Sequence, residues 1–131
     1  MNPNLPDAHI GAASILMEQG KNGEAQKEIS AALSLNPNLP AAYKMRGTQS
    51  LQSGNPSKAV ADFTKAIELD GNDGASYFSR GLGYAQQGDF NSAREDFANA
   101  NSLAAEQGNQ PLLDEIVKYQ NMLEEAAKQQ K

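Results

Sequence analysis

The sequence predicts an all-α fold: an α-solenoid of three helix-turn-helix repeats closed by a C-terminal amphipathic capping helix. Three observations lead to this prediction. Residue types recur at intervals of 34 residues, apolar residues on both sides of each repeated glycine follow helical spacing, and the last segment carries an apolar stripe. Because one helix pair cannot bury its apolar face alone, the period indicates stacked pairs in a single domain spanning residues 1–131.

The repeat is visible in small, bulky and turn-forming residues alike. The three units span residues 6–39, 40–73 and 74–107. The positions that recur every 34 residues are Gly20, Gly54 and Gly88; Ala25, Ala59 and Ala93; Ile29, Phe63 and Phe97; Ala32, Ala66 and Ala100; and Leu35, Leu69 and Leu103.

The turn between the two helices of each unit has clear chemical signals. Each repeated glycine stands where a helix ends, and glycine adopts the left-handed conformation needed there without a Cβ clash. Asn55 is a natural N-cap, Pro56 suits the first helical position, and Asp89 can cap the corresponding helix of the third unit. We therefore expect the second helices to begin near Asn22, Pro56 and Phe90.

Small residues should allow the helices of a unit to pack closely. Gly47 and Gly81, with the repeated alanines, are expected to let two helix backbones approach each other, while the repeated bulky residues fill the space between units. A large residue in place of Ala59 would overpack this contact.

The segment from residue 111 to 129 is predicted to be the capping helix. After Gly108 and Pro111, one broad stripe is apolar and the charged residues lie largely elsewhere. The stripe consists of Leu112, Leu113, Ile116, Val117, Tyr119 and Leu123.

These residues together resemble the tetratricopeptide repeat (TPR) family over residues 6–107. The resemblance rests on a 34-residue unit with Tyr43 or Tyr77, then Arg46-Gly47 or Arg80-Gly81, a turn glycine, and the alanine and leucine positions above. The first unit departs from the pattern, because His9 replaces the aromatic residue and Ala13 replaces the glycine. Gly71 and Ala105 stand where Pro37 closes the first unit.

Stacked helix pairs form a concave surface lined by the first helix of each unit, which binds extended or helical peptides. We therefore predict a module or scaffold that binds a peptide or helix of another protein, with Phe78 beside Leu82 as an anchor. Met45, Leu51 and Leu82 can equally complete the core. The residues expected to face the groove are Asp7, Ile10, Ser14, Met17, Glu18, Lys44, Met45, Thr48, Leu51, Gln52, Phe78, Ser79, Leu82 and Gln86.

One subgroup of the family holds the C-terminal carboxylate of chaperone tails with Lys, Arg and Asn side chains. The matching positions in this sequence hold neither a basic residue nor Asn, so binding of chaperone tails by such a carboxylate clamp is disfavoured. These positions are Ile10, Ser14, Met45, Ala75 and Ser79.

Composition argues against several other functions. A formal net charge of −5 disfavours nucleic acid, and the lack of cysteine excludes thiolate metal sites. No stretch approaches the ~18 consecutive apolar residues of a membrane helix, so we expect no membrane insertion and a cytoplasmic location. The lone His9 lacks partners for a metal site, and Gly81, Gly83 and Gly88 do not have phosphate-loop spacing, so we expect no metal and no cofactor.

Catalysis is not expected either. Glu28, Asp62 and Asp96 recur at the repeat interval, but separate units hold them apart, and Arg46 or Arg80 is the simpler partner for such a carboxylate. We therefore predict that the protein is not an enzyme.

A second hypothesis is self-assembly through the N-terminal face of the first unit. It predicts a homo-oligomer that associates through Leu5, Ile10 and Leu16. The segment Asn2 to Pro6 also repeats the segment Asn36 to Pro40 residue for residue, which suggests that upstream repeats are missing from this sequence.

Overall fold

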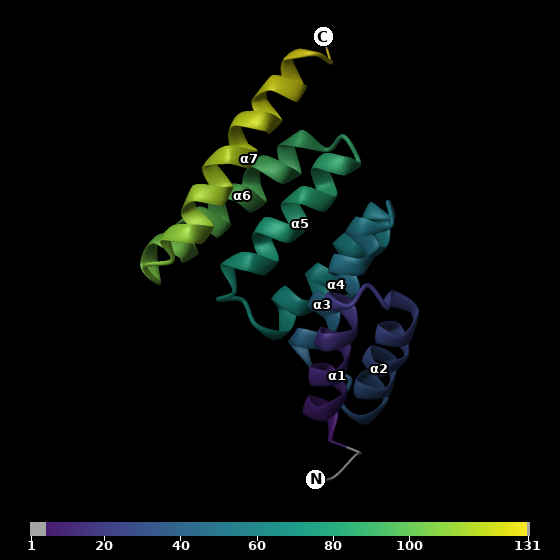
Figure 1. The fold of residues 1–131 in the computed structure, drawn as a ribbon. Coiled ribbons are helices and arrows are strands. Elements are labelled where there is room, and N and C mark those ends of the chain that lie inside the picture. Colours follow the sequence, from purple (N-terminus) through teal and green to yellow (C-terminus); the bar gives the residue numbers. More distant parts are fainter. Residues whose placement is uncertain (1–4, 131) are drawn as a thin grey trace.

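The computed structural model describes residues 5–130, so most of the repeated Asn2 to Pro6 segment lies outside the described residues. The described part contains seven α-helices and no β-strand (Figure 1). Their bounds are α1 (Pro6–Glu18), α2 (Asn22–Leu35), α3 (Pro40–Gln52), α4 (Pro56–Leu69), α5 (Gly74–Gln86), α6 (Phe90–Glu106) and α7 (Gln110–Lys128).

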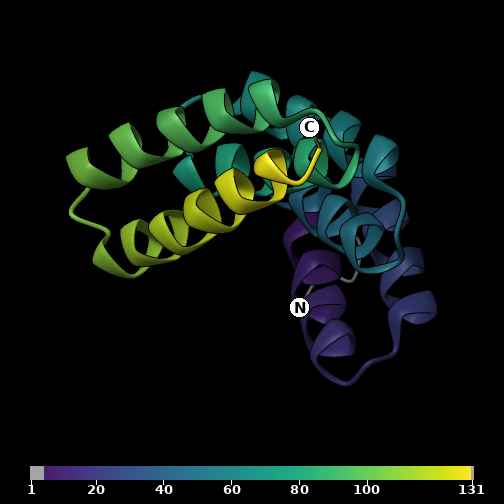
Figure 2. The same cartoon turned by 90° about the horizontal axis from the view of Figure 1, so that it is seen from above.

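The helices stack in sequence order as antiparallel pairs. The helices α1 and α2, α3 and α4, and α5 and α6 form the pairs, each pair packs on the next, and α7 packs on α6 and also touches α5. Figure 2 shows the stack as a curved array with α1 (purple) and α7 (yellow) at either end of its inner side. The predicted all-α solenoid with a C-terminal capping helix is confirmed.

The turns within the helix pairs form as predicted. Gly20, Gly54 and Gly88 have φ angles of 77°, 76° and 82°, a left-handed conformation that favours glycine. The residue after each glycine donates its backbone N–H to the preceding helix; Asn55, for example, donates to the carbonyl of Ser50 at 2.8 Å. Gly108 has the same conformation before α7 (φ 65°).

The second helices begin at Asn22, Pro56 and Phe90, as predicted. Asn55 and Asp89 cap α4 and α6 by accepting backbone hydrogen bonds from Lys58 and Ser92. Two further caps were not predicted, Asp73 for α5 and Asn109 for α7.

The small residues have a role that differs in part from the prediction. Ala25, Ala59 and Ala93 are fully buried, as expected. At Gly47 and Gly81, however, the nearest neighbour is an aromatic ring and not a helix backbone. A Cβ at Gly47 would lie 2.9 Å from the Phe63 ring, and one at Gly81 would lie 2.7 Å from the Phe97 ring. The glycines therefore make room for the bulky residue of their own unit.

The first unit achieves the same packing with a different pair of residues. Ala13 replaces the glycine, and the smaller Ile29 replaces phenylalanine, and both side chains are fully buried in one cluster. Because one residue is larger and the other smaller, the exchange roughly conserves volume, which cores tolerate well.

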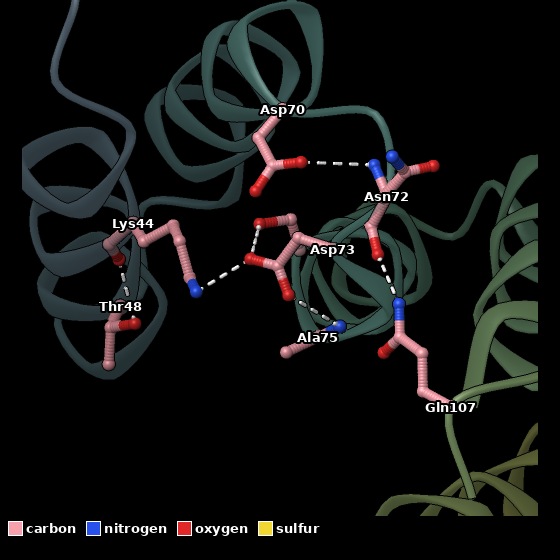
Figure 3. Close-up of polar contacts among 8 residues, drawn as sticks. Lys44, Thr48, Asp70, Asn72, Asp73, Ala75 and Gln107 are labelled. Atoms are coloured by element: carbon pink, nitrogen blue, oxygen red, sulfur yellow. Dashed lines mark hydrogen bonds and ion pairs between the residues drawn. The ribbon is translucent and has the colours of Figure 1, made fainter. Parts of the chain in front are cut away.

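Polar contacts join the second and third units along the inner side (Figure 3). The Lys44 ammonium of α3 lies 2.6 Å from a carboxylate oxygen of Asp73, the N-cap of α5. Burial raises the pKa of Asp73, but hydrogen bonds from Lys44, Ser76 and the Ala75 backbone, together with the Lys44 charge, outweigh it and hold this pKa below its ordinary value. Asp73 is therefore ionised at neutral pH and compensates the Lys44 charge.

Alanine substitutions at two glycines inside helices test whether the aromatic ring requires the glycine beside it. Gly81→Ala should lower the free energy of unfolding by about 1–3 kcal/mol, because the new methyl group meets the Phe97 ring. Gly11→Ala meets nothing within 4 Å and should raise this free energy by about 0.5–1 kcal/mol through helix propensity. Urea unfolding followed by circular dichroism measures both. Equal effects would show that the ring does not require the glycine.

The contact between Lys44 and Asp73 should make the free energy of unfolding depend on pH in the acid range. The pKa of Asp73 is held below its ordinary value, so its contribution to the free energy of unfolding is fully present well above that ordinary value and is lost as pH falls through the lower folded pKa. Asp73→Asn keeps a capping residue and should cost less than about 1 kcal/mol at neutral pH, with the difference from wild type vanishing in acid. Urea unfolding across a pH series measures this difference. Asp70→Asn in the same turn is the control, and an equal loss there would contradict a specific role for Lys44.

Candidate functional site

Two hollows lie on the inner side of the array, and the first lies between α1 and α3. It has a volume of about 360 Å³. Every residue that lines it belongs to the set predicted for the groove. These residues are Ser14, Met17, Glu18, Lys44, Met45 and Thr48.

The second hollow is larger, about 510 Å³, and lies among α3, α5, the start of α6 and α7. Leu51, Gln52, Leu82 and Gln86 were predicted to face the groove and line this hollow. The remaining lining residues are Ala85, Phe90, Phe97, Tyr119, Met122, Leu123 and Ala126. Apolar side chains therefore dominate the larger hollow.

The contribution of α7 was missed by the sequence-based prediction of the groove, which treated this helix only as a cap. The helix has 19 residues, against 13 in α5, and its second half extends along the hollow. The signal was present in the sequence, because Met122 and Ala126 continue the apolar stripe of Tyr119 at helical spacing.

Phe78 is a correction to the predicted set. It is 6% exposed and packs in the core, with its ring centroid 5.6 Å from that of Phe97 and 5.4 Å from that of Tyr119. It cannot serve as an exposed anchor, because α7 places Tyr119 against it. Helical spacing within α5 alone did not reveal this cover.

The other predicted residues do not form one set: some line a hollow, some pack against the core and some do neither. Ile10 packs against the core of the first unit, Ser79 is half-buried, and neither lines a hollow. Asp7 is exposed and lines neither hollow. Met45, Leu51 and Leu82 are all half-buried and line the hollows, and Met45 and Leu82 also pack against core clusters. The two interpretations left open are therefore compatible for Met45 and Leu82.

The repeated carboxylates are used to join the helices of each pair. Arg46 forms two hydrogen bonds to Asp62, at 3.0 and 2.8 Å, and Arg80 forms two to Asp96, both at 2.8 Å. The hydrogen bond to its aspartate is the largest influence on the pKa of each arginine and raises it. The predicted arginine partners are confirmed for these two aspartates.

The first unit has a different polar pair. Ala12 stands at the arginine position, and His9, at the tyrosine position, lies with its Nδ1 2.6 Å from a carboxylate oxygen of Glu28. His9 thus joins α1 to α2 directly.

Two kinds of feature are absent from residues 5–130. No helix there is both long enough and apolar enough to cross a lipid bilayer. No three His, Cys, Asp or Glu side chains in this range are grouped so that they could hold a metal ion.

Comparison with known proteins places the chain in a family. The model of the tetratricopeptide repeat family matches residues 10–73 and again residues 44–107. None of the curated proteins matches the sequence.

Several solved structures share the fold at low sequence identity. The TPR2B domain of yeast Sti1, from a complex with pHsp70, has a TM-score of 0.82 at 22% identity, with 96% of this chain and 98% of that chain covered. The first TPR domain of human RPAP3 has a TM-score of 0.75 at 19% identity, covering 95% of this chain and 98% of that chain. The second TPR of Spaghetti (RPAP3), bound to the HSP90 peptide SRMEEVD, has a TM-score of 0.72 at 21% identity, with coverage of 75% and 91%. With the family match over residues 10–107, these likenesses show that the chain belongs to the tetratricopeptide repeat family.

Proposed function

We propose that this protein is an interaction module that binds a peptide segment of another protein along the inner side of its helical array. The observation that carries the proposal is the pair of hollows between α1 and α3 and among α3, α5 and α7. A hollow lined by Leu51, Leu82 and Tyr119 suits bulky apolar side chains, and glutamines at its edge can donate to and accept from a peptide backbone.

Two of the similar structures contain partner chains of this kind. One is a complex with an HSP90 peptide and the other a complex with pHsp70. They support a peptide as the class of partner. The net charge of −5 argues against nucleic acid as an alternative.

The proposal does not extend to clamping a chaperone-tail carboxylate. Ile10, Ser14, Met45, Ala75 and Ser79 occupy the positions that matter for such a clamp, and none is basic. Lys44 lines the first hollow, but its ammonium is paired with Asp73. A carboxylate would therefore lack the charge-assisted hydrogen bonds that hold it in such a clamp.

Self-assembly through the first unit is a second candidate function. Leu5, Ile15 and Leu35 are 49%, 58% and 48% exposed, and all belong to the first helix pair or its entry. Exposed apolar residues of this size favour association with another surface. Of the face predicted for this role, Ile10 and Leu16 instead pack largely against the core of their own unit.

The groove proposal predicts that apolar lining residues control peptide capture. Wild-type protein should enrich peptides from a displayed random library, and these peptides should bind Met45→Gln, Met122→Gln about tenfold more weakly, because two apolar contacts are lost without a change in charge or much change in size. Fluorescence polarisation with the enriched peptides measures this loss.

Val117→Gln is the matched control. Val117 is 51% exposed on α7 and lines neither hollow, so this variant should bind as wild type does. If the double variant keeps its fold by circular dichroism and captures the same peptides equally well, the binding surface lies elsewhere.

The self-assembly alternative predicts a mass that rises with concentration. On the groove proposal, light scattering should report a monomer across a concentration series. If the protein instead oligomerises and Ile15→Gln restores the monomer, the exposed face of the first helix pair is the functional surface.

A further inference from the structure

The charge that the inner face offers a partner differs from the charge its residue types suggest. Two charged residues, Glu18 and Lys44, line the first hollow. The Lys44 ammonium is 2.6 Å from the Asp73 carboxylate, whereas Glu18 has no ion pair among residues 5–130 and is exposed. The free charge at this hollow is therefore negative.

A further carboxylate, that of Glu125, lies on the opposite side of the groove. No charged residue of the described chain lines the second hollow. Beside it, Glu125 lines a shallow depression together with Met122 and Ala126, which belong to both surfaces. The Lys128 ammonium is 3.4 Å from Glu125, but both side chains are more than 70% exposed, so this pair contributes little free energy and can separate when a partner binds.

Other cations near the inner face are engaged or lie outside the hollows. Arg46 and Arg80 are held by Asp62 and Asp96, and Arg94 is held by Glu124. Lys118 lies 5.9 Å from the centre of the Tyr119 ring and lines neither hollow. An acidic peptide would thus meet Glu18 at the first hollow and Glu125 beside the second, and neither hollow of the described chain is lined by an unpaired cation.

We infer that the partner is a basic, apolar-anchored peptide segment: bulky apolar side chains enter the second hollow, and flanking Lys or Arg residues approach Glu18 and Glu125. This inference rests on the proposed function and specifies its ligand. Glu18 belongs to α1 and Glu125 to α7, and these helices lie at the two ends of the inner side (Figure 2). We therefore expect the cations of the peptide on either side of its apolar anchors. The positive charge inferred for the partner peptide is opposite to the negative charge at the C-terminal end of the HSP90 peptide SRMEEVD in the similar structure.

Asp73 has a positioning role in this arrangement, because it keeps Lys44 from presenting an unpaired cation to the groove. Figure 3 shows the Lys44 side chain directed at Asp73, which simultaneously accepts hydrogen bonds from Ser76 and from the Ala75 backbone. Removing the Asp73 charge would leave the Lys44 ammonium unpaired beside Glu18, so the first hollow would lose its net negative charge and with it the preference for a cation.

The experiment uses the same displayed random peptide library with the full chain. Peptides enriched by wild type, and lost with Met45→Gln, Met122→Gln, should carry a net positive charge next to apolar residues. A synthetic copy of the best peptide should bind at least about tenfold more weakly when its Lys and Arg residues are replaced by Glu. Its affinity should also fall as salt concentration rises, since the attraction is electrostatic.

Charge variants of the protein test the residues assigned to this preference. Glu18→Gln and Asp73→Asn should each weaken binding of the basic peptide about two- to fivefold. Both variants should bind its Glu-substituted copy more tightly than wild type does. Glu68→Gln and Asp70→Asn are the matched controls, because Glu68 lies exposed on α4 in the outer layer and Asp70 does not contact Lys44. Both controls should bind the basic peptide as wild type does.

The outcomes separate the two proposals. If the enriched peptides depend on Met45 and Met122 but are acidic, or bind equally well after the charge replacement, the inference about charge is wrong and groove binding stands. If no enriched peptide depends on these methionines, the proposed groove fails, and the inference fails with it.

Discussion

In every repeat, a bulky side chain of the second helix occupies the space beside a small residue of the first. Phe63 fills the space over Gly47, Phe97 that over Gly81, and in the first unit Ile29 and Ala13 share a buried cluster. Because this contact sets how closely the two helices of a pair approach, it also sets the shape that the next pair must fit. The curvature of the array, and with it the inner face, depends on this repeated packing.

The polar contacts recur with the same period, and they join the two helices in each unit. Arg46 and Arg80 each bind an aspartate of their own unit's second helix, and His9 and Glu28 take this role in the first unit. Asp62 and Asp96 are buried, and a buried carboxylate without its partner would be costly, so the two arginine pairs favour one alignment of their helices over others. They also use carboxylates and cations that would otherwise contribute to the charge of the surface.

The surface of the inner face therefore consists of the side chains that are not engaged in contacts between units. The pair formed by Lys44 and Asp73 joins the second and third units and removes a cation from the groove. The helix α7 covers Phe78 and adds Tyr119 and Met122 to the wall of the second hollow. An apolar floor with Glu18 and Glu125 beside it remains, and this combination underlies both proposals about the partner.

The sequence by itself determined the helices, their turns and their pairing, because these depend on local signals that recur every 34 residues, such as Gly54 with Asn55 and Pro56. Helical spacing also identified all residues that line the first hollow and four that line the second; their role in binding stays a prediction. Only the tertiary structure decided that Phe78 is buried, that Lys44 is paired and that α7 forms a wall of the second hollow. Each of these facts joins segments far apart in the chain, and α7 lies outside the repeat period. Their relative positions follow from packing between units: the apolar stripe of α7 indicates an apolar face but not which helices that face contacts.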